Sequence, residues 1–314
     1  MTDVTLARTP GRITGWLRAR LVPLAVINLA TNMLLVVTGG VVRLTSSGLG
    51  CPTWPECTDG SYVRHGATGI HGVIEFTNRM LTYVLVAVAI AVVIAAWKHR
   101  GKVRRLAVGI ALGIPLQAVI GGISVLTKLN PWVVALHLLA SMAMVCLCVW
   151  LVDTLWSPRR QAASRLVRSL AIATFAVGWV VLWLGTIVTG SGPHSGDIHS
   201  KRTGLDPATV SQLHAAAVDV LVVLTICLLI AGRRDRYLRL VFGALLGVEL
   251  LQGVVGWIQY ETGLPAFVVG LHMLGAALTA AGLARAVLAT RRHAADYATE
   301  PVRRGEPAGA SPIR

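Results

Sequence analysis

The sequence predicts an all-α polytopic membrane protein with eight transmembrane helices, arranged as two tandem four-helix bundles related by a pseudo-two-fold axis along the membrane normal. Of its 314 residues, 54% are hydrophobic and only 14% are charged, and the apolar residues fall into long runs. An internal repeat predicts the division into halves. Segments 116–139 and 251–274 align without a gap at an offset of 135 and match at 12 of 24 positions.

Eight windows are long enough to cross a hydrocarbon core of roughly 30 Å at about 1.5 Å per residue. They lie near 21–42, 71–97, 104–126, 131–152, 166–189, 209–231, 238–258 and 265–289. The first run lacks a small-residue cleavage site before it, so we expect a retained helix rather than a signal peptide. The expected divisions are a cytoplasmic tail at 1–20, a half at 21–156, a cytoplasmic linker at 157–168, a half at 169–290 and a disordered cytoplasmic tail at 291–314.

The net charge of +15 is a topology signal in such a chain and does not indicate a nucleic-acid partner. Of the Lys and Arg residues, 23 fall in the tails and alternate loops and 5 in the remaining loops. The chain is therefore expected in the cell (plasma) membrane, and by the positive-inside rule both termini are expected on its cytoplasmic side. The two longest loops, 43–70 and 190–208, are then extracytoplasmic, and we expect the functional sites toward that side.

Three histidines occupy apolar helices at one expected depth. His137 and His272 are equivalent in the repeat, and His214 lies in the window near 209–231. Each is six or seven residues into its helix, roughly 9–10 Å below the outer end. His214 and His272 come from two helices of one bundle, as bis-histidine ligation of a haem requires. The alternative is a buried histidine bonded to a neighbouring helix, which three at one depth disfavour.

The window near 71–97 carries His71, Glu75 and Asn78 at i, i+4 and i+7, on one stripe of the helix. A carboxylate is expensive in lipid, so Glu75 is a candidate proton donor, proton acceptor or electrostatic stabiliser. The alternative is an ion pair with Arg79 at i+4. The two interpretations are compatible, because Arg79 can also serve a haem propionate.

Cys51 and Cys57 lie close together in CPTWPEC, within the first outer loop. In an oxidising compartment they should be able to form a disulfide. A structural staple for this loop and a redox role remain equally open at this point.

The eight-helix duplicated plan, CPTWPEC, IEFTNR, QLHAA and the repeated LHLL and LHML together resemble the bacterial haem A synthase family. These membrane enzymes convert haem O to haem A for cytochrome oxidase, and the resemblance covers essentially 20–290. It implies a resident haem b on His214 and His272 and a substrate haem on His137. It also implies that Glu75 takes part in hydroxylating a porphyrin methyl group.

The same resemblance links Cys51 and Cys57 to redox chemistry or haem handover. One position departs from the family pattern, because the usual E-x-x-H-R reads Glu75-Phe76-Thr77-Asn78-Arg79 here. Asparagine is a poor ligand for haem iron, so we expect a five-coordinate substrate haem on His137, with an open position suited to oxygen. His71 could substitute only in a different haem pose, since it lies about 10 Å along the helix from Asn78.

The expected function is oxidation of the C8 methyl of haem O to a formyl group by two successive hydroxylations. A non-catalytic b-type cytochrome passing electrons from quinol to an outer-side acceptor is the alternative. A secondary transporter is a third class, although it typically shows broken helices at mid-membrane. The expected partners are haem O, haem O synthase, an unidentified electron donor and membrane lipid, with a possible homo-oligomer.

Overall fold

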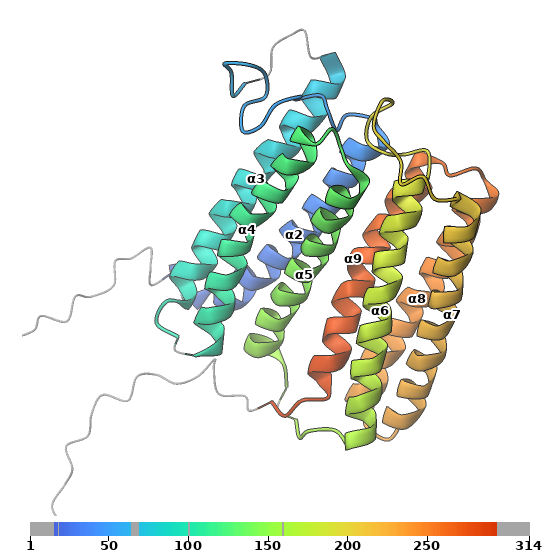
Figure 1. Ribbon diagram of the computed structural model, residues 1–314. Coiled ribbons are helices and arrows are strands. Elements are labelled where there is room, and N and C mark those ends of the chain that lie inside the picture. Colours follow the sequence, from blue (N-terminus) through green and yellow to red (C-terminus); the bar gives the residue numbers. More distant parts are fainter. Residues whose placement is uncertain (1–15, 18, 64–68, 100, 159, 294–314) are drawn as a thin grey trace, which may run out of the picture.

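The computed structural model describes residues 16–17, 19–63, 69–99, 101–158 and 160–293, and within these ranges the chain is helical (Figure 1). Eight helices of the described chain are long and apolar enough to cross a membrane, as predicted. They are α2 (Leu21–Leu44), α3 (Gly69–Ala96), α4 (Lys102–Leu126), α5 (Pro131–Trp156), α6 (Arg165–Ser191), α7 (Pro207–Gly232), α8 (Arg236–Glu261) and α9 (Ala266–Ala289). The predictions for 1–15 and 294–314, most of the two tails, lie outside the described residues.

Side-chain caps set several helix starts. Ser164 accepts a hydrogen bond from the Val167 amide, so α6 begins at Arg165, inside the segment predicted as a linker and before the predicted start of the second half. Asp206 accepts from the Thr209 amide at the start of α7. Asp235 caps α8 in the same way. Capping therefore moves these helix starts one or two residues ahead of the hydropathy windows.

The helices form two groups, α2–α5 and α6–α9, which lie side by side in Figure 1. In each group the first helix packs on the second and fourth, and the third also packs on the second and fourth. At the seam α5 packs on α9, α2 packs on α9, and α6 packs on α5. Corresponding helices therefore make corresponding contacts, while the pseudo-two-fold axis and the domain division stay predictions.

Apolar side chains fill each group and the seam. The seam cluster contains Val36, Met142, Leu182, Ala277 and Ala280. Large apolar side chains also cover the outside of the bundle, where hydrocarbon rather than water would solvate them. The fold is therefore that of a multi-pass membrane protein.

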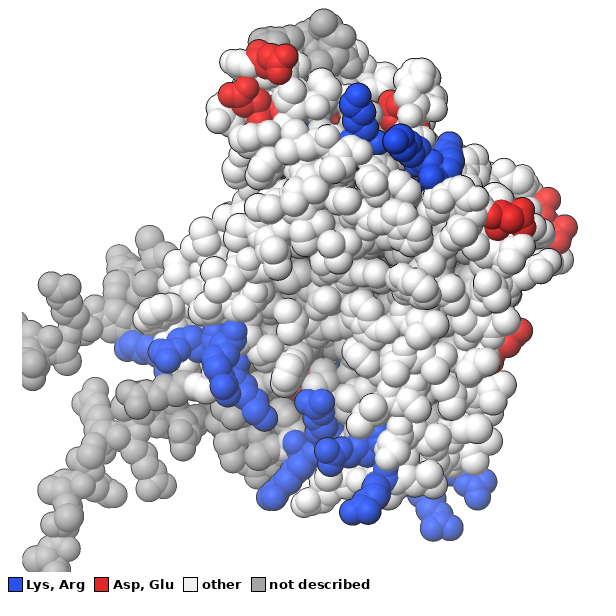
Figure 2. Space-filling model, in the orientation of Figure 1, with Lys and Arg blue, Asp and Glu red and all other residues white. Residues whose placement is uncertain are grey.

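The two ends of the bundle differ in charge. We call the end with loops 45–68 and 192–206 the outer end, and the end with 97–101, 157–164 and 233–235 the inner end. Lys and Arg side chains gather at the inner end in Figure 2, and most of the acidic side chains visible there lie toward the outer end. This is the asymmetry from which cytoplasmic termini are predicted; the orientation itself stays a prediction.

Candidate functional site

The three predicted histidines lie at one level near the outer end. His137 is the seventh residue of α5, His214 the eighth of α7 and His272 the seventh of α9. At about 1.5 Å per residue, each is roughly 9–10 Å from the outer end of its helix. The helix starts therefore agree with the common depth expected from sequence.

Each of these imidazoles packs against a glycine on the preceding helix. A Cβ added to that glycine would lie 3.2 or 3.3 Å from the imidazole Cε1, tighter than ordinary van der Waals contact. The pairs are His137 with Gly121, His214 with Gly185 and His272 with Gly256. Since Gly121 and Gly256 are equivalent in the repeat, the same packing arrangement occurs in both halves.

The Nδ1 atoms of all three histidines are buried and have no hydrogen-bond partner among the described residues. The backbone of Val181 approaches His214 without meeting hydrogen-bond geometry. Buried polar atoms normally have hydrogen-bond partners, so contacts among the described residues do not account for an imidazole at these three positions. Imidazole is a common axial ligand of haem iron, and these residues fit that group.

A repeated glutamine supports the histidine-bearing turns. In the second half Gln252 Nε2 donates to the His272 carbonyl at 2.9 Å. In the first half Gln117 Nε2 donates to Ser141 Oγ at 2.8 Å, and Ser141 Oγ donates to the His137 carbonyl at 2.9 Å. The helix before each histidine therefore fixes its backbone, directly in one half and through a serine in the other.

The first outer loop lies directly on α3. A Cβ at Gly50 would overlap the backbone of His71 and Gly72, so the close approach requires glycine. The next residue, Cys51, donates its amide to Glu75 Oε2 at 2.7 Å. The loop and Glu75 are thus fixed to each other.

Glu75 is buried, with 5% of its surface exposed, and forms the ion pair with Arg79 that was considered as an alternative role. Arg79 Nη2 lies 2.6 Å from Glu75 Oε1. The same guanidinium donates to the carbonyls of Cys51, Thr53 and Glu56 at 3.0–3.1 Å. Arg79 therefore holds both the carboxylate and the loop above it.

The predicted disulfide between Cys51 and Cys57 is present, with an S–S distance of 1.99 Å. Within the ring that it closes, Trp54 packs against Gly122 of α4, where a Cβ would overlap the indole. Sequence reasoning assigned no role to Trp54. The repeat held a signal, because Gly122 in the first copy is replaced by Trp257 in the second.

Substituting Gly122→Ala should destabilise the protein by about 1–3 kcal/mol, because the new methyl must displace the Trp54 indole. Gly109→Ala on the same helix is the matched control, since a Cβ there meets nothing within 4 Å. The control should be neutral or slightly stabilising, because alanine favours helix. Thermal unfolding of both variants in detergent measures the difference; equal midpoints would contradict the packing.

Asn78 and His71 have different surroundings. Asn78 Oδ1 accepts a hydrogen bond from Thr38 Oγ1 of α2 at 2.7 Å. His71 is exposed, and its Nδ1 lies 3.0 Å from Ser47 Oγ. Asn78 therefore bonds inside the bundle, whereas His71 faces the outer end.

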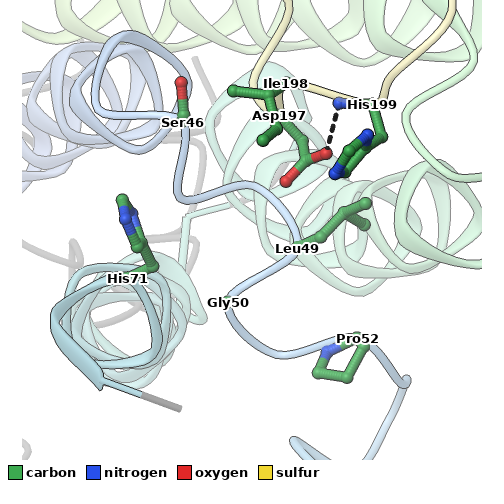
Figure 3. Close-up of a pocket in the computed structure, with 8 residues that line it drawn as sticks. All are labelled: Ser46, Leu49, Gly50, Pro52, His71, Asp197, Ile198 and His199. Carbon is green, nitrogen blue, oxygen red and sulfur yellow. Dashed lines mark hydrogen bonds between the residues drawn. The ribbon is translucent and has the colours of Figure 1, made fainter.

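A cavity of about 470 Å³ opens beside His71, between the outer loops of the two halves (Figure 3). Its lining residues are Ser46, Leu49, Gly50, Pro52, His71, Asp197, Ile198 and His199. Across the cavity from His71, the His199 amide donates to Asp197 Oδ1 at 2.8 Å. The cavity thus offers two imidazoles and a carboxylate at the outer end of the seam.

The two outer loops are also bonded directly. The Gly48 amide donates to the Gly196 carbonyl at 2.9 Å. Arg43 donates to the carbonyls of Thr189, at 2.7 Å, and His194. These contacts fix the first-half loop against the second half.

Comparison with known proteins identifies the family of this chain. The sequence profile of the COX15-CtaA family, described as cytochrome oxidase assembly protein, matches residues 23–193. The chain belongs to the COX15-CtaA family. Relatives named heme A synthase include one from Listeria welshimeri, 25% identical, and one from Listeria monocytogenes, 26% identical; each alignment covers 80% of this chain and 88% of the relative. A heme A synthase of Bacillus pumilus is 32% identical over 41% of this chain and 44% of its own length.

The COX15-CtaA match contains the outer loop with its disulfide, Glu75, Asn78 and His137. His214 and His272 lie beyond its last matched residue. Their interpretation as ligands is supported by the repeat for His272 and, for both residues, by the packing geometry that they share with His137.

Proposed function

We propose that this protein is a haem A synthase, oxidising the C8 methyl of haem O to a formyl group by two successive hydroxylations. The curated relatives of that name support it. The observation that carries the proposal is the difference between the halves. The half with His137 has a carboxylate near the outer end, Glu75, held under a disulfide-closed loop, whereas the other half has two histidines at the same level.

His214 and His272 would hold a resident haem b, and His137 would bind haem O as substrate. When bound, the haems supply electron transfer and oxidative chemistry that protein side chains cannot. The glycines opposite the imidazoles let α4, α6 and α8 approach the ligand-bearing helices closely. Gln117 and Gln252 fix the backbone of the ligands from those neighbouring helices.

Glu75 would act on the substrate as a fixed negative charge or a proton acceptor. Its position is determined by the Cys51 amide and Arg79, so little reorganisation is needed during reaction. Trp54 and the disulfide-closed loop lie over the same part of α3 and α4, where they limit access of water.

Pigment extraction after expression with a supply of haem O tests this function. Appearance of haem A supports the synthase. Unchanged haem O together with a redox-active haem b would instead identify a non-catalytic cytochrome, and a colourless protein would exclude both.

Asn78 allows a test of substrate ligation. Asn78 Oδ1 is already bonded to Thr38, which supports the proposal that the substrate haem is five-coordinate on His137. Asn78→Ala should therefore leave the spin state of the substrate haem unchanged, and so should His71→Ala, because His71 faces the outer cavity. Electron paramagnetic resonance of the haem O-loaded protein measures this. Loss of a second low-spin signal in His71→Ala alone would show that His71 is a ligand.

A further inference from the structure

A second cavity, of about 430 Å³, lies at the inner end of the seam between the halves. Its deep part is lined by Leu29 of α2, Val149 of α5 and Ala281 of α9, about 10–12 Å from the inner ends of their helices. Its shallow part is lined by Asp153, Ser157 and Arg285. The cavity is therefore apolar within and polar at the membrane surface.

The shallow part carries an excess of positive charge. Asp153 is buried and accepts from Ser157 Oγ at 2.6 Å, Arg285 Nη1 at 2.6 Å and Arg160 Nη2 at 3.0 Å. Two guanidinium groups thus share one carboxylate. The Arg160 side chain is only 8% exposed, and its Nη1 is buried without a hydrogen-bond partner among the described residues.

A third arginine, Arg291, neighbours Arg160. Arg160 Nε donates to the Arg291 carbonyl at 3.1 Å, and the Arg291 guanidinium lies 5.6 Å from the centre of the Trp150 ring. Arg285 also donates to the Tyr237 hydroxyl. Basic side chains gather at this end on the face shown in Figure 2. The local charge therefore favours an anion, most strongly where hydrocarbon lowers the dielectric constant.

We propose that this cavity binds an anionic phospholipid of the adjacent leaflet, with its phosphate at Arg285 and an acyl chain between Leu29, Val149 and Ala281. The charge complements the headgroup, and the apolar depth complements the chain. Since the walls come from α2, α5 and α9, the lipid would contact both halves and stabilise their seam. A quinol fits less well, because Asp153, the one carboxylate among the described residues that line the cavity, already accepts hydrogen bonds from two arginines and a serine.

The test uses the full-length protein in detergent, with lipid retention measured by native mass spectrometry. Wild type should retain phosphatidylglycerol in preference to phosphatidylcholine of the same acyl chains. Arg285→Gln should weaken phosphatidylglycerol binding about tenfold, because a charge-assisted hydrogen bond is lost. Ala281→Leu, which fills the apolar part, should weaken both lipids.

Two substitutions serve as matched controls. Arg239→Gln removes an exposed arginine at the inner end of α8, and Ala244→Leu adds the same volume at a similar depth on the exposed face of α8. Both should retain lipid as wild type does. If Arg285→Gln fails to fold, the preference of wild type for phosphatidylglycerol tests the charge and Ala281→Leu tests the cavity.

Several results would overturn the proposal. Equal retention of the two lipids would remove the role of the headgroup charge. If Ala281→Leu retained lipid as wild type does, the lipid would bind elsewhere. Displacement of the lipid by millimolar-range inorganic phosphate alone would indicate a small-anion site, and competition by a quinone analogue in place of phosphatidylglycerol would indicate a quinol site.

Discussion

Replacing Glu75 by glutamine is expected to lower haem A formation by roughly 10²-fold or more while leaving the resident haem b bound. Glutamine keeps the shape of the side chain but removes the charge that pairs with Arg79, and it leaves one acceptor oxygen in place of the two that serve Arg79 and the Cys51 amide. Extracted pigments from cells supplied with haem O should then contain haem O in place of haem A. The b-type absorbance of the purified protein should persist, since His214 and His272 are in the other half.

Glu261→Gln is the matched control, because Glu261 is an exposed carboxylate at the outer end of α8. It should form haem A as wild type does. A Glu75→Gln variant with normal haem A content would show that Glu75 serves only the ion pair. Loss of haem b together with haem A would indicate a folding defect and no specific role in the reaction.

Alanine at His272 and alanine at His137 should have opposite effects on the two haems. His272→Ala should lose the bis-histidine low-spin signal of the proposed resident haem, because it removes one of the two imidazoles proposed to bind that haem. His137→Ala should keep that signal and lose haem A formation. Electron paramagnetic resonance and pigment extraction on the same preparations measure both.

His199→Ala provides the control, since His199 lines the outer cavity and lies outside the membrane-spanning helices. It should retain both properties. If His137→Ala lost the resident low-spin signal and His272→Ala kept it, the assignment of the two haems to the halves would be reversed.

Hydropathy alone predicted all eight helices, because long apolar runs have only one stable conformation in a bilayer. It was less accurate at the ends. The window near 131–152 stops before Asp153, yet α5 continues to Trp156, since Asp153 is satisfied by Arg160 and Arg285. Arg285 lies 132 residues away in sequence, so no local pattern could reveal that pairing.

The candidate site, too, could be predicted from the sequence only in part. The repeat predicted the common depth of His137 and His272, because equivalent residues in equivalent helices share a level. It could not predict that the Cys51 amide would bond Glu75 or that Trp54 would pack on Gly122. Both contacts depend on how the outer loop folds back over α3 and α4, which side-chain spacing within one helix does not determine.

The disulfide sulfur atoms are shielded, since Cys51 and Cys57 are 0% and 1% exposed. Thiol–disulfide exchange requires a thiolate to reach one of the two sulfurs, so an external thiol must wait until segment 51–57 lifts. Lifting it breaks the bonds that connect the loop to Glu75 and Arg79. The rate at which a small thiol reduces this disulfide therefore measures the rate at which segment 51–57 opens away from Glu75.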